Sequence, residues 1–158
     1  MEGVLLPLAG WLDAIGLGRW ASGAPYPIVN TLHLLGLVML VGGIGVVDLR
    51  VVGFWRSLSL PALSRALTPV AIAGLAILVP TGLLLFAADG KSLAGSDMFF
   101  RKLVIIGFAL TNAIAFRILW QGRLERGEPP STTARVMAGV SLLLWLAVGT
   151  LGRLIAYS

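Results

Sequence analysis

The stretch of sequence that decides the fold runs from residue 33 to residue 50 and reads HLLGLVMLVGGIGVVDLR. It is almost wholly apolar, begins with the single histidine of the chain and ends with Asp-Leu-Arg. An apolar run of this length without period-2 alternation predicts a helix, and it approaches the ~20 residues that cross the hydrocarbon of a bilayer. His33 and Asp48 therefore lie near opposite ends of a predicted transmembrane helix.

The rest of the 158-residue chain has the composition of a membrane protein. It is 58% hydrophobic and 12% charged, whereas soluble domains are about 45–50% apolar and about 25% charged. Predicted transmembrane helices occupy about residues 27–52, 66–88, 99–120 and 135–156. A weaker helical stripe over about residues 3–18 predicts a short interfacial helix, with a re-entrant helix as the alternative.

The connections between the predicted spans are short, so neighbouring helices are expected to be antiparallel. Only helices or closed barrels satisfy the backbone inside hydrocarbon. The sequence therefore predicts a single all-α membrane domain over residues 1–158. This domain is an integral membrane four-helix up-down-up-down bundle with a short N-terminal interfacial helix. The chain has no cysteine, which excludes disulfides, thiolate metal sites and iron–sulfur clusters.

The positive charges indicate how the bundle is oriented. The net charge is +5, and the basic residues lie mainly in short segments near the ends of apolar runs. This pattern indicates membrane topology, and no nucleic-acid partner is expected. Seven basic residues fall on the side of the first and third connections and five on the other side. The positive-inside rule therefore predicts both termini outside, in the periplasm if the membrane is a bacterial inner membrane.

Polar side chains inside the predicted spans are the candidate functional residues, because hydrocarbon makes them expensive. Asn30 and His33 lie one turn apart, and Asp48 lies five turns beyond Asn30, so these three residues are expected to share a helix face. Gly36 and Gly43 lie within about 80° of His33 and permit the close approach of another helix. This face is expected to point into the bundle.

Near the outer ends of the spans, His33, Thr81 and Arg153 are expected to form one cluster. A neutral imidazole can bind haem iron, so haem b held by His33, with Arg153 at a propionate, is one hypothesis. A second axial ligand would have to be Met39, Met98, Met137 or the His33 of another copy. A hydrogen-bonded structural histidine is the alternative.

Near the inner ends, Asp48 is expected to form a charge pair with Arg117 or Arg50. Such a pair is more often a lock that fixes helix assembly than a proton relay, and arginines near helix ends can instead extend to the interface. Asn112 and Ser141 lie within their spans and are expected to form hydrogen bonds between helices.

Several short motifs, in this order, resemble a family of small bacterial four-span membrane proteins of unknown function. That family is distantly similar to the membrane domain of CopD-type copper-resistance proteins. The motifs lie at residues 26–27, 33–36, 48–50, 81–86, 112–116, 141–145 and 152–157. The resemblance implies a four-helix inner-membrane domain and no established activity. Relatives often carry histidine where this chain has Arg117, so the resemblance does not extend to a two-histidine cofactor site.

Three functional classes agree with these residues, and no motif identifies an enzymatic reaction. The first, which we favour from the sequence, is a non-catalytic accessory or assembly protein that forms a homo-oligomer or joins a larger membrane complex. The second is a haem- or quinone-linked redox protein that uses His33 with Arg153. The third is a small transporter or channel that uses His33, Asp48 and Arg117. A water-accessible cavity that connects polar side chains would distinguish this last class.

Overall fold

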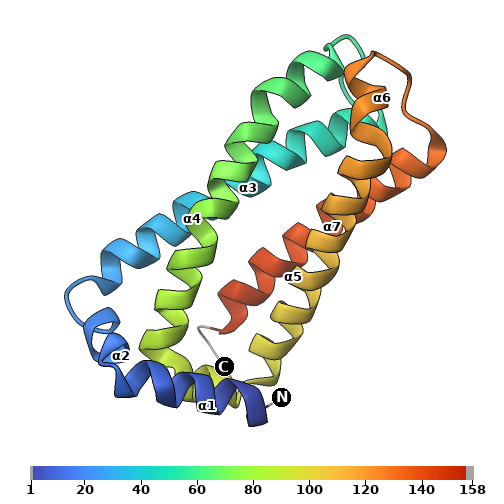
Figure 1. Cartoon of the computed structure of the whole chain (residues 1–158). Helices are drawn as coiled ribbons and strands as arrows, with labels where there is room; N and C mark the ends of the chain where they lie inside the picture. The colour runs from blue at the N-terminus through green and yellow to red at the C-terminus, as the bar shows by residue number, and fades with distance from the viewer. Residues whose placement is uncertain (1, 156–158) are drawn as a thin grey trace.

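The computed structural model describes residues 2–155, and its helices confirm the all-α fold class, with four long apolar helices and a short N-terminal helix. No strand occurs in this range. Ala156 and Tyr157, which end the predicted fourth span and the last motif, lie outside the described residues. In chain order the elements are α1 (Glu2–Ala14), α2 (Leu17–Ala21), α3 (Tyr26–Val52), α4 (Leu60–Ala94), α5 (Asp97–Phe116), the π-helical turn η1 (Arg117–Gln121), α6 (Gly122–Glu125) and α7 (Thr132–Leu154) (Figure 1).

Four helical segments are long and apolar enough to cross a membrane. They are α3, α4, the continuous run from α5 through α6, and α7. The chain is therefore a polytopic membrane protein. This length and hydropathy leave only short connections between the spans, so the functional groups of the protein lie mainly on the spans themselves.

The second span begins earlier than its hydropathy alone indicates. Ser59 is the N-cap of α4 and its side chain accepts a hydrogen bond from the backbone N–H of Ala62 at 3.4 Å, with Pro61 in the first turn. Both features favour a helix start. The added first turns bring Ser64 into the helix, one turn before Thr68. These two residues contribute to the candidate site described below.

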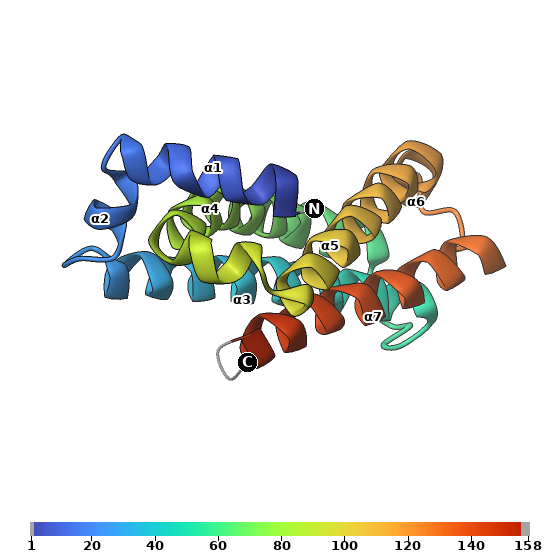
Figure 2. The same cartoon turned by 90° about the horizontal axis from the view of Figure 1, so that it is seen from below.

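The long helices cross one another rather than running parallel (Figure 1). Helix α3 packs along α4 and along α7, and α5 packs chiefly on α7, whereas α4 and α5 make little contact. The turned view in Figure 2 shows α1 beside α4, where it packs through Ala9 and Leu12 against Phe86 and Ala87. Because the helices cross, the face of α3 that is covered by neighbours changes along its length.

The contact between α3 and α4 depends on glycine. A Cβ atom on Gly74 would lie 2.6 Å from the carbonyl oxygen of Gly36, and one on Gly43 would lie 3.0 Å from the carbonyl oxygen of Leu67. Backbones meet this closely only where no side chain intervenes. Gly36 and Gly43 therefore face a neighbouring helix, as the sequence predicts.

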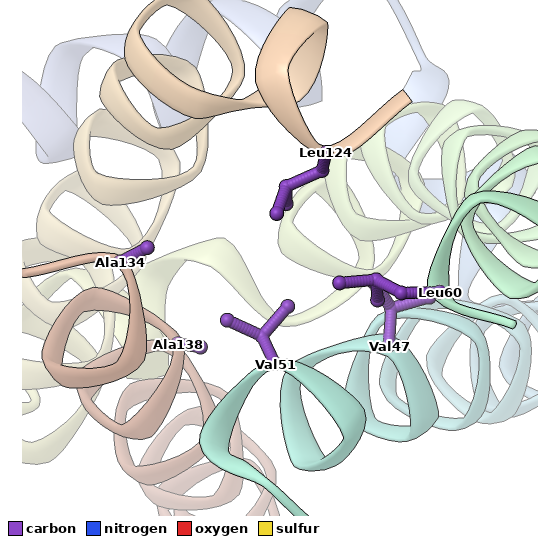
Figure 3. Close-up of a cluster of buried hydrophobic side chains, with 6 residues drawn as sticks. All are labelled: Val47, Val51, Leu60, Leu124, Ala134 and Ala138. Atoms are coloured by element: carbon purple, nitrogen blue, oxygen red, sulfur yellow. The ribbon is translucent and has the colours of Figure 1, made fainter. Parts of the chain in front are cut away.

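A cluster of buried apolar side chains fills the bundle at the end where α3 meets the start of α4. Figure 3 shows its side chains converging from several helices. Its members are Val47, Val51, Leu60, Leu124, Ala134 and Ala138. The cluster joins α3, α4, α6 and α7, so it fixes the ends of all four spans at this side of the bundle relative to one another.

Candidate functional site

At one end of the bundle, the structure brings together two members of the predicted outer cluster. The Nδ1 atom of His33 lies 2.9 Å from the hydroxyl oxygen of Thr81. That hydroxyl donates to the backbone carbonyl of Ile77 at 2.6 Å. A side-chain hydrogen bond therefore joins His33 on α3 to Thr81 on α4.

The other predicted members of this end are arranged differently. Asn30 is exposed, so the prediction that the face it shares with Asp48 points into the bundle is wrong at this end of the helix. The reason is the crossing of α3 with its neighbours, which leaves its first turns partly uncovered. Arg153 has an exposed side chain on α7. Lys102 is half-buried on α5, and its charge acts on His33, in agreement with the similar depth that the sequence indicates for the two residues.

At the opposite end, Asp48 is the most consequential polar residue. Its side chain is only 3% exposed, and it interacts with the hydroxyl of Ser141, which is also 3% exposed. Its second carboxyl oxygen, Oδ2, is buried without a hydrogen-bond partner among the described residues. An unpartnered buried oxygen is rare in folded proteins and indicates strain, function or a bound species.

The predicted charge pair of Asp48 with Arg50 or Arg117 does not form. Arg50 donates instead to the carbonyl oxygens of Leu58 at 2.8 Å and Arg56 at 3.0 Å. Two residues along a helix correspond to about 200° of rotation, so Arg50 points away from Asp48. Arg117 extends an exposed side chain from η1. Within residues 2–155, the ion pairs present join Lys91 to Asp13 and Arg126 to Glu128.

Asp48 borders a cavity of about 60 Å³ that lies where the four spans meet. A space of this size has room for a few water molecules. Its polar lining comes from every span and comprises Asp48, Ser64, Thr68, Asn112, Arg117, Gln121 and Ser141. The structure thus brings the predicted polar residues Asp48, Asn112, Arg117 and Ser141 to the lining of one cavity.

Hydrogen bonds within the cavity wall leave acceptor oxygens free to face the interior. The side-chain amide of Asn112 donates to the carbonyl oxygen of Met137 at 3.1 Å, so its Oδ1 atom remains an acceptor. The hydroxyls of Ser64 and Thr68 lie 3.4 Å apart. The sequence prediction omitted these two residues and Gln121. Ser64 and Thr68 could have been predicted from the sequence, because the Ser-Leu-Pro signal at residue 59 starts a helix. Their i, i+4 spacing then places them on one face of it.

The N-terminal helix is attached to α4 by an exposed ion pair. Lys91 donates to Asp13 at 3.0 Å, and this hydrogen bond together with the charge of Lys91 lowers the pKa of Asp13 below its ordinary value. The pair joins α1 to the last turns of α4, whereas the cavity at Asp48 is lined by residues from the first turns of that helix.

His33 and Arg153 do not line the cavity at Asp48 or the larger cavity beside Arg50 and Arg56. Among the described residues no group of three or more histidine, cysteine or acidic side chains could hold a metal ion. Haem b at His33 therefore stays a prediction from the sequence.

Comparison of the chain with protein-family models, with curated proteins and with solved structures found no match. The chemistry of the described side chains is therefore the basis for a functional proposal.

Proposed function

We propose that this membrane protein loads and releases a proton at Asp48, and so belongs to the transport class of small polytopic proteins. One observation supports the proposal above all others. A carboxyl group that is 3% exposed has an oxygen without a hydrogen-bond partner within residues 2–155, and it lies beside a polar cavity to which all four spans contribute.

The charge of Asp48 has to be neutralised in this position. An ionised carboxylate buried without a counter-ion is expensive, and within a membrane such groups mark proton or ion pathways. No arginine or lysine pairs with Asp48 among the described residues. A proton on Oδ2 removes the charge, and the hydroxyls and amide oxygen of the cavity wall can accept the resulting O–H.

Arg117 gives the site a second state. Its guanidinium borders the same cavity but has an exposed side chain in this structure. When Asp48 loses its proton, a movement of Arg117 toward the cavity would neutralise the carboxylate. Arg117 and Gln121 belong to η1, a π-helical turn, and such turns are frequent at functional sites. Exchange of the proton would thus be coupled to a movement of the Arg117 side chain.

Proton flux into vesicles tests the proposal. The protein is reconstituted in vesicles that enclose a pH-sensitive dye, and a pH step is applied with valinomycin and potassium present. We expect wild type to equilibrate faster than empty vesicles and Asp48→Asn to lose that difference. Asp97→Asn, an exposed carboxyl at the start of α5, is the matched control and should keep it. Flux by Asp48→Asn equal to wild type, or no flux by wild type, would refute the proposal.

Infrared difference spectroscopy separates loading from transport. A protonated carboxyl has a carbonyl stretch that an ionised one lacks, so wild type should show this band at neutral pH and Asp48→Asn should not. A band that persists in Asp48→Asn would assign the buried proton to another group. A band lost in Asp48→Asn, together with no flux in wild type, would contradict transport while retaining Asp48 as a proton site.

An accessory or assembly role is the second candidate, and the third span favours it. Only 6% of the most apolar stretch of Asp97–Glu125 is buried, compared with 28% or more for the other three spans. Lipid or a protein partner can cover this surface. If a protein covers it, the chain forms a homo-oligomer or joins a larger membrane complex. Cross-linking of the protein in native membranes, with a residue on α5 as the reactive position, distinguishes a protein partner from lipid.

Placement in the bacterial inner membrane with both termini outside is likewise a proposal, supported by the seven basic residues on the side of the first and third connections against five on the other side. Because the chain has no cysteine, single cysteines give an unambiguous test. A cysteine at Ser57 should resist an impermeant maleimide in intact cells, and one at Ser92 should react. The reverse pattern would invert the topology.

A further inference from the structure

A second cavity lies at the loop end of the bundle and differs in chemistry from the one at Asp48. Its volume is about 330 Å³. Three arginines line it, at the end of α3, in the following loop and in the first turns of α7. They are Arg50, Arg56 and Arg135. The only acidic residue in the lining is Glu128, and it is already paired with Arg126 at 2.9 Å.

The loop holds two of these guanidinium groups in place. Arg50 donates through Nε and Nη2 to the carbonyl oxygens of Leu58 and Arg56, and Arg56 donates through Nε to that of Gly53 at 3.2 Å. A guanidinium has five N–H donors, so each group keeps donors for a ligand. Guanidinium groups match the oxygens of phosphate and carboxylate, and those held in advance lose less entropy on binding.

The same cavity has an apolar floor. Val51, Leu60 and Leu124 border it, and these side chains also belong to the buried cluster shown in Figure 3. Pro61, Pro129 and Pro130 add further apolar surface. The cavity lies at the ends of spans, where the head groups of a bilayer would be. A ligand that suits this surface combines an anionic group with an apolar body.

We propose that this cavity binds the phosphate group of an anionic phospholipid, with Arg56 and Arg135 contacting the phosphate and the acyl chains following the apolar surface. Basic pockets between transmembrane helices bind lipid head groups by this chemistry. A free phosphate anion would make the same contacts with the arginines but has no acyl chains, so it is the alternative ligand to be tested. The site is separate from the proton site at Asp48, and neither proposal depends on the other.

The test measures lipid retention by native mass spectrometry of protein released from nanodiscs that contain phosphatidylcholine and phosphatidylglycerol. The variant Arg56→Gln/Arg135→Gln removes two charges from the cavity. The control Arg65→Gln/Arg123→Gln removes two charges from the same end of the bundle but outside the cavity lining. A thermal melt of each protein establishes that it is folded. If the double cavity variant does not fold, Arg135→Gln alone, an exposed side chain on α7, replaces it.

We expect wild type to retain phosphatidylglycerol in preference to phosphatidylcholine. Each cavity arginine removed should weaken retention about five-fold, the change that corresponds to about 1 kcal/mol per basic residue at a membrane surface. The control should retain the lipid as wild type does. Equal losses in the two double variants, or no preference in wild type, would overturn the site. Stabilisation by inorganic phosphate without any lipid preference would assign the free anion and overturn the lipid.

Discussion

Replacing Gly74 by alanine places a methyl group where the backbones of α3 and α4 touch. The new Cβ would lie 2.6 Å from the carbonyl oxygen of Gly36 and 2.6 Å from the backbone nitrogen of Leu40. Ordinary contacts of a Cβ atom begin at 3.4 Å. The helices would therefore have to separate locally by roughly the difference between 2.6 and 3.4 Å. Neither backbone atom can move aside as a side chain would.

The expected loss of stability follows from two opposing effects. Overpacking a close contact costs about 1–3 kcal/mol, and a clash with backbone belongs at the upper end of this range. Alanine in place of glycine within a helix returns up to about 1 kcal/mol. We therefore expect Gly74→Ala to lower the free energy of unfolding by about 2 kcal/mol.

Gly42→Ala is the matched control, because Gly42 lies on α3 beside the contact face and a Cβ there meets nothing within 4 Å. It should be neutral or stabilising by up to about 1 kcal/mol. Reversible unfolding in mixed micelles, followed by circular dichroism, measures both variants. If Gly74→Ala were as stable as Gly42→Ala, the close packing of α3 on α4 would be wrong.

Three further predictions follow from particular contacts. Thr81→Val should leave Nδ1 of His33 without its hydrogen-bond partner, and a double-mutant cycle with His33→Leu should give a coupling of about 0.6–1.7 kcal/mol, whereas additive losses would show that the two do not interact. Asn112→Leu should lower stability by about 0.6 kcal/mol through loss of its bond to α7, and an unchanged melting temperature would contradict that bond. The ion pair of Asp13 lowers its pKa, so its contribution should be complete above the ordinary aspartate value of about 3.9 and disappear as the pH falls below it. The melting temperatures of wild type and Asp13→Asn should therefore converge in acid and in high salt, and a constant difference would exclude the pair as the cause.

Hydropathy and helix signals in the sequence were sufficient for the architecture of this protein. Inside hydrocarbon each backbone group must be bonded within its own helix, so the length of an apolar run predicts a span with little help from its neighbours. The sequence also predicted which face of α3 meets α4, because Gly36 and Gly43 lie on that face. The start of α4 was missed because Ser59 and Pro61 signal it more clearly than hydropathy does.

The tertiary structure decided the chemistry of the candidate site. Counting residues gives depth and rotation on a straight helix, but only the crossing of α3 with its neighbours explains why Asp48 is buried and Asn30 is exposed. The sequence predicted an ion pair for Asp48 because Arg50 and Arg117 lie at a similar depth in the membrane. In the structure, Arg50 instead donates a hydrogen bond to a carbonyl oxygen of the following loop, and the side chain of Arg117 is exposed.

The sequence by itself therefore determined that His33 and Asp48 lie near opposite ends of one membrane-crossing helix, because apolar length and helical rise are local properties. Only the packing of four spans brought Ser64, Asn112 and Ser141 around Asp48, because a cavity between helices depends on where several of them meet.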